Sequence, residues 1–404
     1  MQKRRIAGQP SAARGGLDAD RGTILPAMQV VRLALVVCVS AVAAAQAPVP
    51  AQPQSPPQTR QVWQMQESGT SAGLRGIDSV DGTVAWASGT GGTVLRTVDG
   101  GAHWQRCATP DAATDGATLD FRGVQTWDAD TAIVMASGLG EKSRLYKTTD
   151  GCKTWALLFT NPDPDGFWDA VSADRKMGII VGDPVGGRFA IFSSTDSGLE
   201  KWKRFGESSD YERFRFEPSP YEGEELFAAS NSNMRGIPTA GMAFVTGGPR
   251  GAFFAYGAWL SHGPSGYPTA EFAKTRVPLA EGKSAGAFSF SCSERKFSRT
   301  AFKCIAVGGD YLLPDSSAGT AAYSSNSGMR WKASKAAPHG FRSAVQWSEA
   351  LKVWITVGTN GSDISRDDGK TWQPLDDGNW NALSLPFVVG PNGRIARLNP
   401  DRLP

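Results

Sequence analysis

Short apolar segments, separated by polar and glycine-rich turns, dominate the chain after residue 60, whereas long runs with apolar residues at helical spacing are rare. This pattern is typical of many short strands joined by turns. Seven of the segments open in a similar way, at Leu74-Arg75, Phe121-Arg122, Trp168-Asp169, Met234-Arg235, Gly286-Ala287, Phe341-Arg342 and Trp380-Asn381. The corresponding positions are 47, 47, 66, 52, 55 and 39 residues apart, close to the about 40 to 50 residues of a four-stranded propeller blade. The spacing therefore predicts seven blades.

A second repeat, of the form Ser/Thr-x-Asp-x-Gly-x-x-Trp, follows the third expected strand in five blades. Residues 97–104 and 365–372 match it fully, and residues 148–155, 194–202 and 324–331 match it with one substitution or insertion. The Asp or Asn of such a turn accepts hydrogen bonds from backbone N–H groups, the Gly supplies a positive φ, and the Trp is expected to cover the apolar face of its blade. Turn-forming residues recur in every repeat, whereas a catalytic site is usually unique. We therefore interpret the following residues as structural: Asp99, Trp104, Asp150, Trp155, Asp196, Trp202, Asn326, Trp331, Asp367 and Trp372.

The ring is expected to close through the N-terminal part of the propeller. Each blade shows four strand-like runs with a glycine-rich turn after the second, but the last blade ends after its third strand, at residues 394–398. Residues 61–67 can supply the missing outer strand, which would leave no open edge. The predicted fold is all-β, a seven-bladed β-propeller of four-stranded antiparallel blades that spans residues 61–404.

The residues before the propeller carry an export signal. Residues 33–45 form an apolar run after Arg32, with small residues at Ala43, Ala45 and Ala47. This is the pattern of a secretory signal peptide, and the run is shorter than the about 20 apolar residues of a membrane-spanning helix. We predict a leader and signal peptide at residues 1–46, starting at Met1 or Met28, and a Pro- and Gln-rich linker at residues 47–60. The mature protein is expected in the periplasm or outside the cell.

Charge and motifs argue against several classes of partner. The chain has 42 Lys and Arg against 39 Asp and Glu, and six of the basic but only two of the acidic residues lie in the predicted leader. The mature chain is thus nearly neutral, which argues against nucleic acid as a partner. We find neither the strand, Gly-x-Gly-x-x-Gly and helix of a dinucleotide site nor a close spacing of Cys and His. No metal or other cofactor is therefore expected.

Four cysteines follow the predicted leader. An even number in an exported protein permits disulfides. Cys292 and Cys304 flank a turn between two strand-like runs, so we expect them to pair. Cys107 and Cys152 would then form the second disulfide, with buried free thiols as the alternative for this pair.

With these repeats, residues 61–404 resemble the photosystem II stability and assembly factor family, whose seven-bladed propellers share Asp-box turns with bacterial sialidases. The repeat turns, the Val-Gly turns after the second strands and the openings of the Phe-Arg-Gly-Val type carry the likeness. The resemblance implies a non-enzymatic scaffold or assembly factor that binds a membrane-protein client, with a cluster of arginines on one face. It does not identify the client.

Strand direction places the repeat turns on one face of the ring and the starts of the innermost strands on the other. Four arginines are therefore expected around the axial opening: Arg75, Arg122, Arg235 and Arg342. Asp169 and Asn381 occupy equivalent places, and Asp183, Asp310, Tyr311 and Asn360 are expected to reach in from neighbouring turns. Converging guanidinium groups can bind a carboxylate or another oxyanion. In the alternative, each Arg pairs with an acidic residue of the adjacent blade and holds the ring together.

The sequence favours an exported, non-enzymatic and monomeric propeller that binds a protein client, membrane-associated or not, or an anionic small ligand. The alternative is a sialidase-type glycoside hydrolase, in which Tyr311 would be the nucleophile and Asp183 or Asp310 the acid. A shared fold alone is weak support for shared chemistry. Residues 206–233, rich in acidic and aromatic side chains, are expected to form a loop over the same face.

Overall fold

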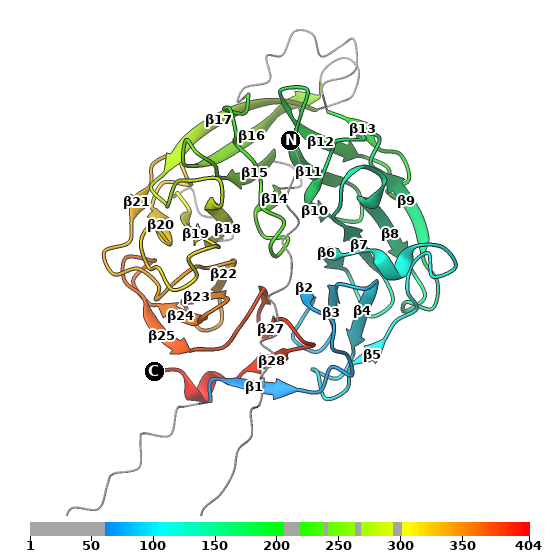
Figure 1. Ribbon diagram of the computed structural model, residues 1–404, viewed down its shortest axis with the longest axis horizontal. Helices are drawn as coiled ribbons and strands as arrows, with labels where there is room; N and C mark the ends of the chain where they lie inside the picture. The colour runs from blue at the N-terminus through cyan, green and yellow to red at the C-terminus, as the bar shows by residue number, and fades with distance from the viewer. Residues whose placement is uncertain (1–60, 206–218, 238–240, 263–267, 294–300) are drawn as a thin grey trace, which may run out of the picture. The chain divides into compact units, whose positions relative to one another are not determined.

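Seven four-stranded antiparallel sheets surround a common centre in the described part of the chain (Figure 1). The computed structural model describes residues 61–205, 219–237, 241–262, 268–293 and 301–404, all within a compact unit that spans residues 57–404. The predicted leader, signal peptide and linker lie outside the described residues. The prediction of a seven-bladed, all-β propeller is confirmed.

The blades follow one another along the chain, and the first strand of a blade lies nearest the centre (Figure 1). Their strands are, for blade 1, β2 (Leu74–Ser79), β3 (Ala85–Gly89), β4 (Thr93–Thr97) and β5 (Gln105–Arg106); for blade 2, β6 (Phe121–Thr126), β7 (Ala132–Ala136), β8 (Arg144–Thr148) and β9 (Ala156–Thr160); for blade 3, β10 (Trp168–Ala173), β11 (Gly178–Val185), β12 (Arg188–Ser194) and β13 (Lys203–Arg204); for blade 4, β14 (Met234–Ile237), β15 (Gly241–Thr246), β16 (Ala252–His262) and β17 (Pro268–Val277). Blade 5 has β18 (Ala285–Ser293), β19 (Lys303–Asp310), β20 (Ala321–Ser324) and β21 (Lys332–Ala333); blade 6 has β22 (Ala344–Ser348), β23 (Val353–Gly358), β24 (Gly361–Ser365) and β25 (Gln373–Asp376); blade 7 has β26 (Ala382–Ser384), β27 (Phe387–Val389), β28 (Ile395–Leu398) and β1 (Trp63–Gln66). Short 3-10 helices occur at Gly116–Thr118, Gly140–Lys142 and Pro400–Arg402.

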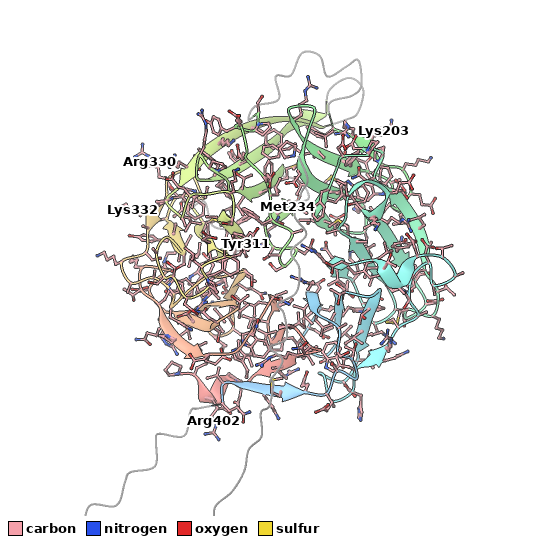
Figure 2. The ribbon with its side chains drawn as sticks, viewed as in Figure 1. Lys203, Met234, Tyr311, Arg330, Lys332 and Arg402 are labelled. Atoms are coloured by element: carbon pink, nitrogen blue, oxygen red, sulfur yellow. A yellow bond between two sulfur atoms is a disulfide. The ribbon has the colours of Figure 1, made fainter. Side chains whose placement is uncertain are left out.

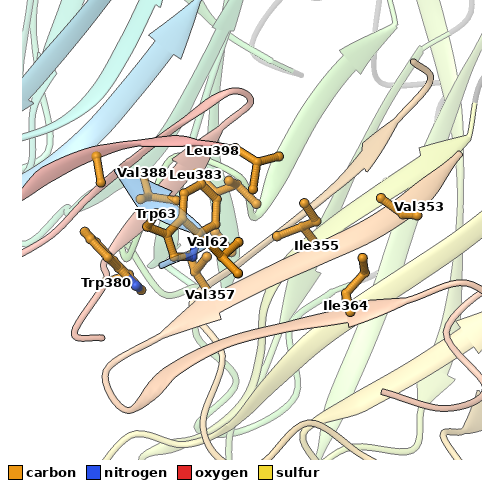
Figure 3. Packing of buried hydrophobic residues seen from close by; sticks show 12 residues of the cluster. Val62, Trp63, Val353, Ile355, Val357, Ile364, Trp380, Leu383, Val388 and Leu398 are labelled. Carbon is orange, nitrogen blue, oxygen red and sulfur yellow. The ribbon is translucent and has the colours of Figure 1, made fainter. Parts of the chain in front are cut away.

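Strand β1 closes the ring as predicted. It pairs antiparallel with β28, from Trp63 opposite Leu398 to Gln66 opposite Ile395. The buried Trp63 side chain joins an apolar cluster that blades 6 and 7 share, beside Val357 and Leu383 (Figure 3). The N-terminal and C-terminal ends of the propeller thus belong to one blade.

The apolar core lies mainly between blades. Four tryptophans of the repeat turns pack against an aromatic ring of the preceding blade: Trp104 on Phe387 at 5.7 Å, Trp155 on Trp86 at 6.3 Å, Trp202 on Phe159 at 5.8 Å and Trp331 on Phe254 at 5.5 Å between ring centroids. Such contacts stabilise by apolar burial and by edge-to-face or stacked geometry. The sequence pattern suggested that each Trp covers its own blade, but the structure uses it to join two blades.

The repeat turns share one hydrogen-bonding arrangement. In all five, the first hydroxyl donates to the Asp or Asn two residues later, at distances of 2.6 to 3.0 Å. In four of them the same hydroxyl oxygen accepts the N–H of the fifth residue. The Asp or Asn side chain also accepts N–H groups at the end of the turn, for example that of His103 on Asp99 at 3.0 Å. The turns therefore satisfy their polar groups locally.

Both predicted disulfides are present, between Cys107 and Cys152 and between Cys292 and Cys304. Cys107 follows the outer strand of blade 1 and Cys152 lies in the repeat turn of blade 2, so this disulfide joins two blades. The second disulfide links two paired positions of β18 and β19.

Across the described residues, no helix has the length and apolar character needed to cross a membrane.

Candidate functional site

Three innermost strands carry a β-bulge next to their first residue. In blades 1, 2 and 3 the pairing with the second strand skips one residue, namely Arg75, Arg122 and Asp169, respectively. A bulge bends the strand and redirects a side chain. These three predicted site residues therefore occupy corresponding positions where the innermost strands begin. We call this side of the ring the arginine face.

Arg75 and Arg122 form an electrostatically unbalanced pair. Arg122 Nε donates to Asp120 Oδ2 at 2.8 Å, while the buried Nε of Arg75 has no hydrogen-bond partner among the described residues. Burial lowers the pKa of Arg75, the positive charge of Arg122 lowers it further, and only Asp120 opposes this. Arginine nevertheless stays protonated near neutral pH. Asp120 therefore pairs with Arg122 and acts on Arg75 only through its charge, so an added anion would stabilise both cations.

The chain immediately before β14 crosses the centre of the ring. Ala228 O accepts a hydrogen bond from Arg122 Nη1 of blade 2 at 3.0 Å. Asn231 exchanges two hydrogen bonds with the Val171 backbone of blade 3, at 2.8 and 3.0 Å. Ser232 bonds Ser289 of blade 5 at 2.7 Å, and Ser230 donates to Ser343 O of blade 6 at 2.8 Å. Residues 228–232, which we call the axial segment, therefore connect four blades.

The sequence did not reveal this role of the axial segment. Residues 206–233 were expected to form a loop over the face, and residues 206–218 lie outside the described part of the chain. The one available signal is the run of small polar residues at 230–233, which directly precedes an innermost strand. Side chains of this kind can satisfy backbone groups of several strands at once.

Arg342 does not belong to the predicted arginine cluster. The backbone N–H of Arg342 donates to the backbone carbonyl of Gly308 in the preceding blade at 2.9 Å. The backbone N–H groups of Leu74 and Trp380 make the same kind of hydrogen bond to a glycine of their preceding blades. Arg342 thus takes the buried place of Leu74, and Ser343 takes the place of Arg75. A shift by one residue turns a strand side chain to the other face. The prediction that its guanidinium lines the axial opening is therefore wrong.

The Arg342 guanidinium is instead satisfied inside blade 6. It is 0% exposed, and its Nε donates to Asp363 Oδ2 at 2.7 Å. Its Nη1 donates to Asn360 Oδ1 at 2.5 Å, which fixes the predicted site residue Asn360 beside it. His339 Nδ1 lies 2.8 Å from Asp363, and this hydrogen bond raises the pKa of His339. Arg122 and Arg342 thus each pair with a carboxylate of their own blade, not of the adjacent one.

Arg235 also lies away from the other arginines. The N–H of Gly236 donates to Ser172 of the preceding blade at 3.1 Å, as the N–H of Thr126 donates to Asp78 at 2.7 Å. Arg235 therefore corresponds to Gln125, three residues after Arg122, or about 10 Å further along the strand. The matching Arg-Gly-Ile phrase concealed this shift, because the insertion before β14 moves the register of blade 4. Arg235 is exposed, but it does not share a common point with Arg75 and Arg122.

The predicted acidic and amide residues serve mainly the scaffold. Asp169 is buried, and Asp183, also buried, accepts the N–H of Leu226 at 3.1 Å. Asn381 Nδ2 donates to Leu74 O at 2.7 Å and so links blade 7 to blade 1. Asp310 Oδ1 accepts the N–H of Leu312 at 2.9 Å.

Among the described residues, no group of three or more His, Cys, Asp and Glu side chains is placed to hold a metal ion.

Tyr311 belongs to an aromatic cluster beside the centre of the ring (Figure 2). Its ring lies 6.4 Å from Phe227 and 6.1 Å from Phe288, and these two phenylalanines stack at 4.0 Å. Burial and the carboxylates of Asp310 and Glu225 raise the pKa of Tyr311. A phenolate nucleophile would need the opposite shift. Sequence reasoning did not identify Phe227 and Phe288 as part of this face.

A scan of protein-family models finds no match for the chain, and a search of curated proteins finds none either. Solved structures match over most of its length. The chain is similar to YCF48 from Cyanidioschyzon merolae, with a TM-score of 0.54 and 19% identity over 84% of this chain and 99% of that chain. It is also similar to YCF48 bound to D1 peptide, with a TM-score of 0.54 and 16% identity over 83% of this chain and 96% of that chain. At these identities the likeness shows the fold alone, a β-propeller, and no more.

Proposed function

We propose that this chain is an exported, non-enzymatic scaffold that engages a protein client through a carboxylate held between Arg75 and Arg122. One observation carries the proposal: Arg75 and Arg122 are neighbours on the arginine face, and of these two only Arg122 has a carboxylate partner among the described residues, Asp120 at 2.8 Å, while the buried Nε of Arg75 has none. A second carboxylate would accept charge-assisted hydrogen bonds from both arginines and offset their repulsion.

Three further observations support this choice. The structurally similar YCF48 has been solved with a bound D1 peptide, which is a protein ligand. Two disulfides fit an oxidising compartment, as the predicted signal peptide implies. The sialidase-type alternative lacks comparable support, because Arg342 is buried and the pKa of Tyr311 is raised.

The proposal is tested with a fluorescein-labelled octapeptide that contains one Asp in a background of Gly, Ser and Leu, and with its Asn counterpart. We expect the Asp peptide to bind at least about ten-fold more tightly in a fluorescence anisotropy titration, since a hydrogen bond to a charged group contributes about 1.5 to 3 kcal/mol. The R75E/R122E variant should lose this preference.

The matched control is the R330E/K332E variant, which makes the same change in charge at two exposed residues on the outer rim (Figure 2). It should bind the Asp peptide like the unmodified protein. The proposal fails if the Asp and Asn peptides bind equally well to the unmodified protein. It also fails if R75E/R122E and R330E/K332E lose the same affinity for the Asp peptide, because the Arg75 and Arg122 pair would then not select a carboxylate.

A further inference from the structure

The arginine face is not uniformly polar, because an aromatic surface begins where the contacts of Arg122 end. Arg122 donates to the carbonyl of Ala228, and the preceding residue, Phe227, stacks on Phe288. Phe288 occupies in blade 5 the bulge position that Arg75 and Arg122 occupy in blades 1 and 2. Tyr311 then contacts both rings. The basic pair and the aromatic cluster are therefore contiguous through the axial segment.

Two exposed leucines directly follow Tyr311 in the chain. Leu312 and Leu313, in the loop between β19 and β20, are 67% and 58% exposed, the largest values among the large apolar side chains of the described residues. Their backbone is held in place, since Asp310 accepts the N–H of Leu312 at 2.9 Å with its side chain and that of Leu313 at 3.0 Å with its carbonyl. We call Phe227, Tyr311, Leu312 and Leu313 the apolar ledge. Exposed apolar side chains that gather in one place typically mark a binding surface.

We propose that the arginine face binds an extended protein segment that carries an apolar side chain two or three residues from its carboxylate. The carboxylate lies between Arg75 and Arg122, and the apolar side chain lies on the apolar ledge. This inference rests on the proposed function and adds the class of segment that the site selects. Charge complementarity fixes the carboxylate end, so an acidic and apolar segment is favoured over a purely apolar one.

The basic pair and the apolar ledge are close along the axial segment, because the residue that Arg122 contacts directly follows Phe227. Ala228, which touches Arg122, and Phe227 are neighbours in the chain, with Cα atoms about 3.8 Å apart. The ring of Tyr311 lies 6.4 Å from that of Phe227. An extended segment advances about 3.3 Å per residue. A spacing of two or three residues thus places the apolar side chain about 7 to 10 Å from the carboxylate, which suits this short path.

The test uses the labelled octapeptide with Asp and Leu two residues apart, together with a version in which Ser replaces the Leu. Burying one leucine side chain is expected to tighten binding about ten-fold. The L312S/L313S variant should bind the Leu peptide about ten-fold more weakly and the Ser peptide with unchanged affinity. Because both leucines are exposed, the melting temperature should stay the same.

The control variant V98S/M329S removes two apolar side chains of 49% and 46% exposure from repeat turns and should leave both affinities unchanged. If Leu and Ser peptides bind equally while Asp still binds better than Asn, the ledge is overturned and the proposed function stands. If Asp and Asn peptides bind equally, the proposed function itself fails. If L312S/L313S changes the sedimentation of the protein alone, the ledge is a self-association surface and the inference is overturned.

Discussion

In four of the five repeat turns the fifth residue has a positive φ, which favours glycine. Gly328 and Gly369 adopt φ values of 82° and 77° there, and a Cβ atom on Gly369 would lie 2.5 Å from Ile305 of the preceding blade. Cys152 occupies the same position with φ 67°. Its side chain crosses to the preceding blade and forms the disulfide with Cys107. Cys152 therefore combines an unfavourable backbone conformation with a covalent link between two blades.

Removing this disulfide should reveal both the stabilisation by the covalent link and the steric cost of a non-glycine residue at position 152. We expect the C107S/C152S variant to lose about 4 kcal/mol of unfolding free energy, because the disulfide closes a loop with a sequence separation of 45. The C107S/C152G variant should be about 1 kcal/mol more stable than C107S/C152S, since Gly adopts a positive φ without a steric cost. Urea unfolding of the three proteins measures both differences. Equal stability of the two variants would mean that the backbone of this turn relaxes when the disulfide is absent.

Neighbouring innermost strands are joined by side chains that accept backbone N–H groups. Gln125 of β6 accepts the N–H of Ala173 in β10 at 2.6 Å, and Asp78 of β2 accepts that of Thr126 in β6 at 2.7 Å. The Gln125 side chain is neutral at every pH. The Asp78 carboxyl group either keeps its proton and stays neutral, or loses it and carries a negative charge away from water. Burial raises the pKa of Asp78 to about 6, although the N–H groups of Thr126 and Ser79 lower it. We therefore expect the stability of the junction between blades 1 and 2 to depend on pH.

The sign of this effect follows from the raised pKa. The folded carboxyl group keeps its proton up to about pH 6, whereas an unfolded Asp loses it near its ordinary pKa of 3.8, so stability from this group is present below pH 4 and is lost as the pH rises through 6. The loss amounts to at most about 3 kcal/mol, at 1.36 kcal/mol per unit of pKa shift. Asp78→Asn keeps an oxygen acceptor for Thr126, so we expect it to be more stable at pH 7.5 and to lack this pH dependence.

The control for this prediction is Asp81→Asn. Asp81 is exposed in the turn after β2, and the N–H groups of Val84 and Thr83 lower its pKa, so its ionised form is stabilising. Asp81→Asn should therefore be less stable than the unmodified protein at pH 7.5. Thermal unfolding between pH 4 and 8 compares the three proteins. A D78N variant whose stability falls between pH 4 and 6 as steeply as that of the unmodified protein would contradict the assignment to Asp78.

At the scale of the whole molecule, the repeats made the architecture predictable from the sequence. The residues of the arginine face were harder to predict, because the register of the innermost strand differs between blades. The spacing of the repeats predicted seven blades and a closing strand, because each blade repeats the same turn chemistry. It could not predict the register of blades 4 and 6, where the same local phrase places Arg235 and Arg342 elsewhere. A one-residue shift changes which face a side chain occupies without changing the strand pattern. The axial segment, which occurs once, had no repeat to identify it.

Closure depends on one short strand that touches three blades. Trp63 of β1 donates from Nε1 to Ser362 of blade 6 at 2.9 Å and packs on Trp380 at 6.1 Å. Gln66 donates to Gly100 O at 3.1 Å and accepts from Trp104 Nε1 at 3.1 Å, both in blade 1. Strand β1 thus links blades 6 and 1 on either side of its own blade.

Removing these contacts should weaken the whole ring. Because Trp63 is buried and Met65 on the same strand is 46% exposed, Trp63→Ala should cost about 3 to 5 kcal/mol of unfolding free energy, whereas Met65→Ala should change it by no more than about 0.5 kcal/mol. Deleting residues 61–67 should also leave β28 as an open edge, which invites pairing between molecules. Urea unfolding measures the first effect and sedimentation the second. If Trp63→Ala and Met65→Ala unfold at the same urea concentration, and the deletion stays monomeric and folded, then β1 is not needed to close the propeller.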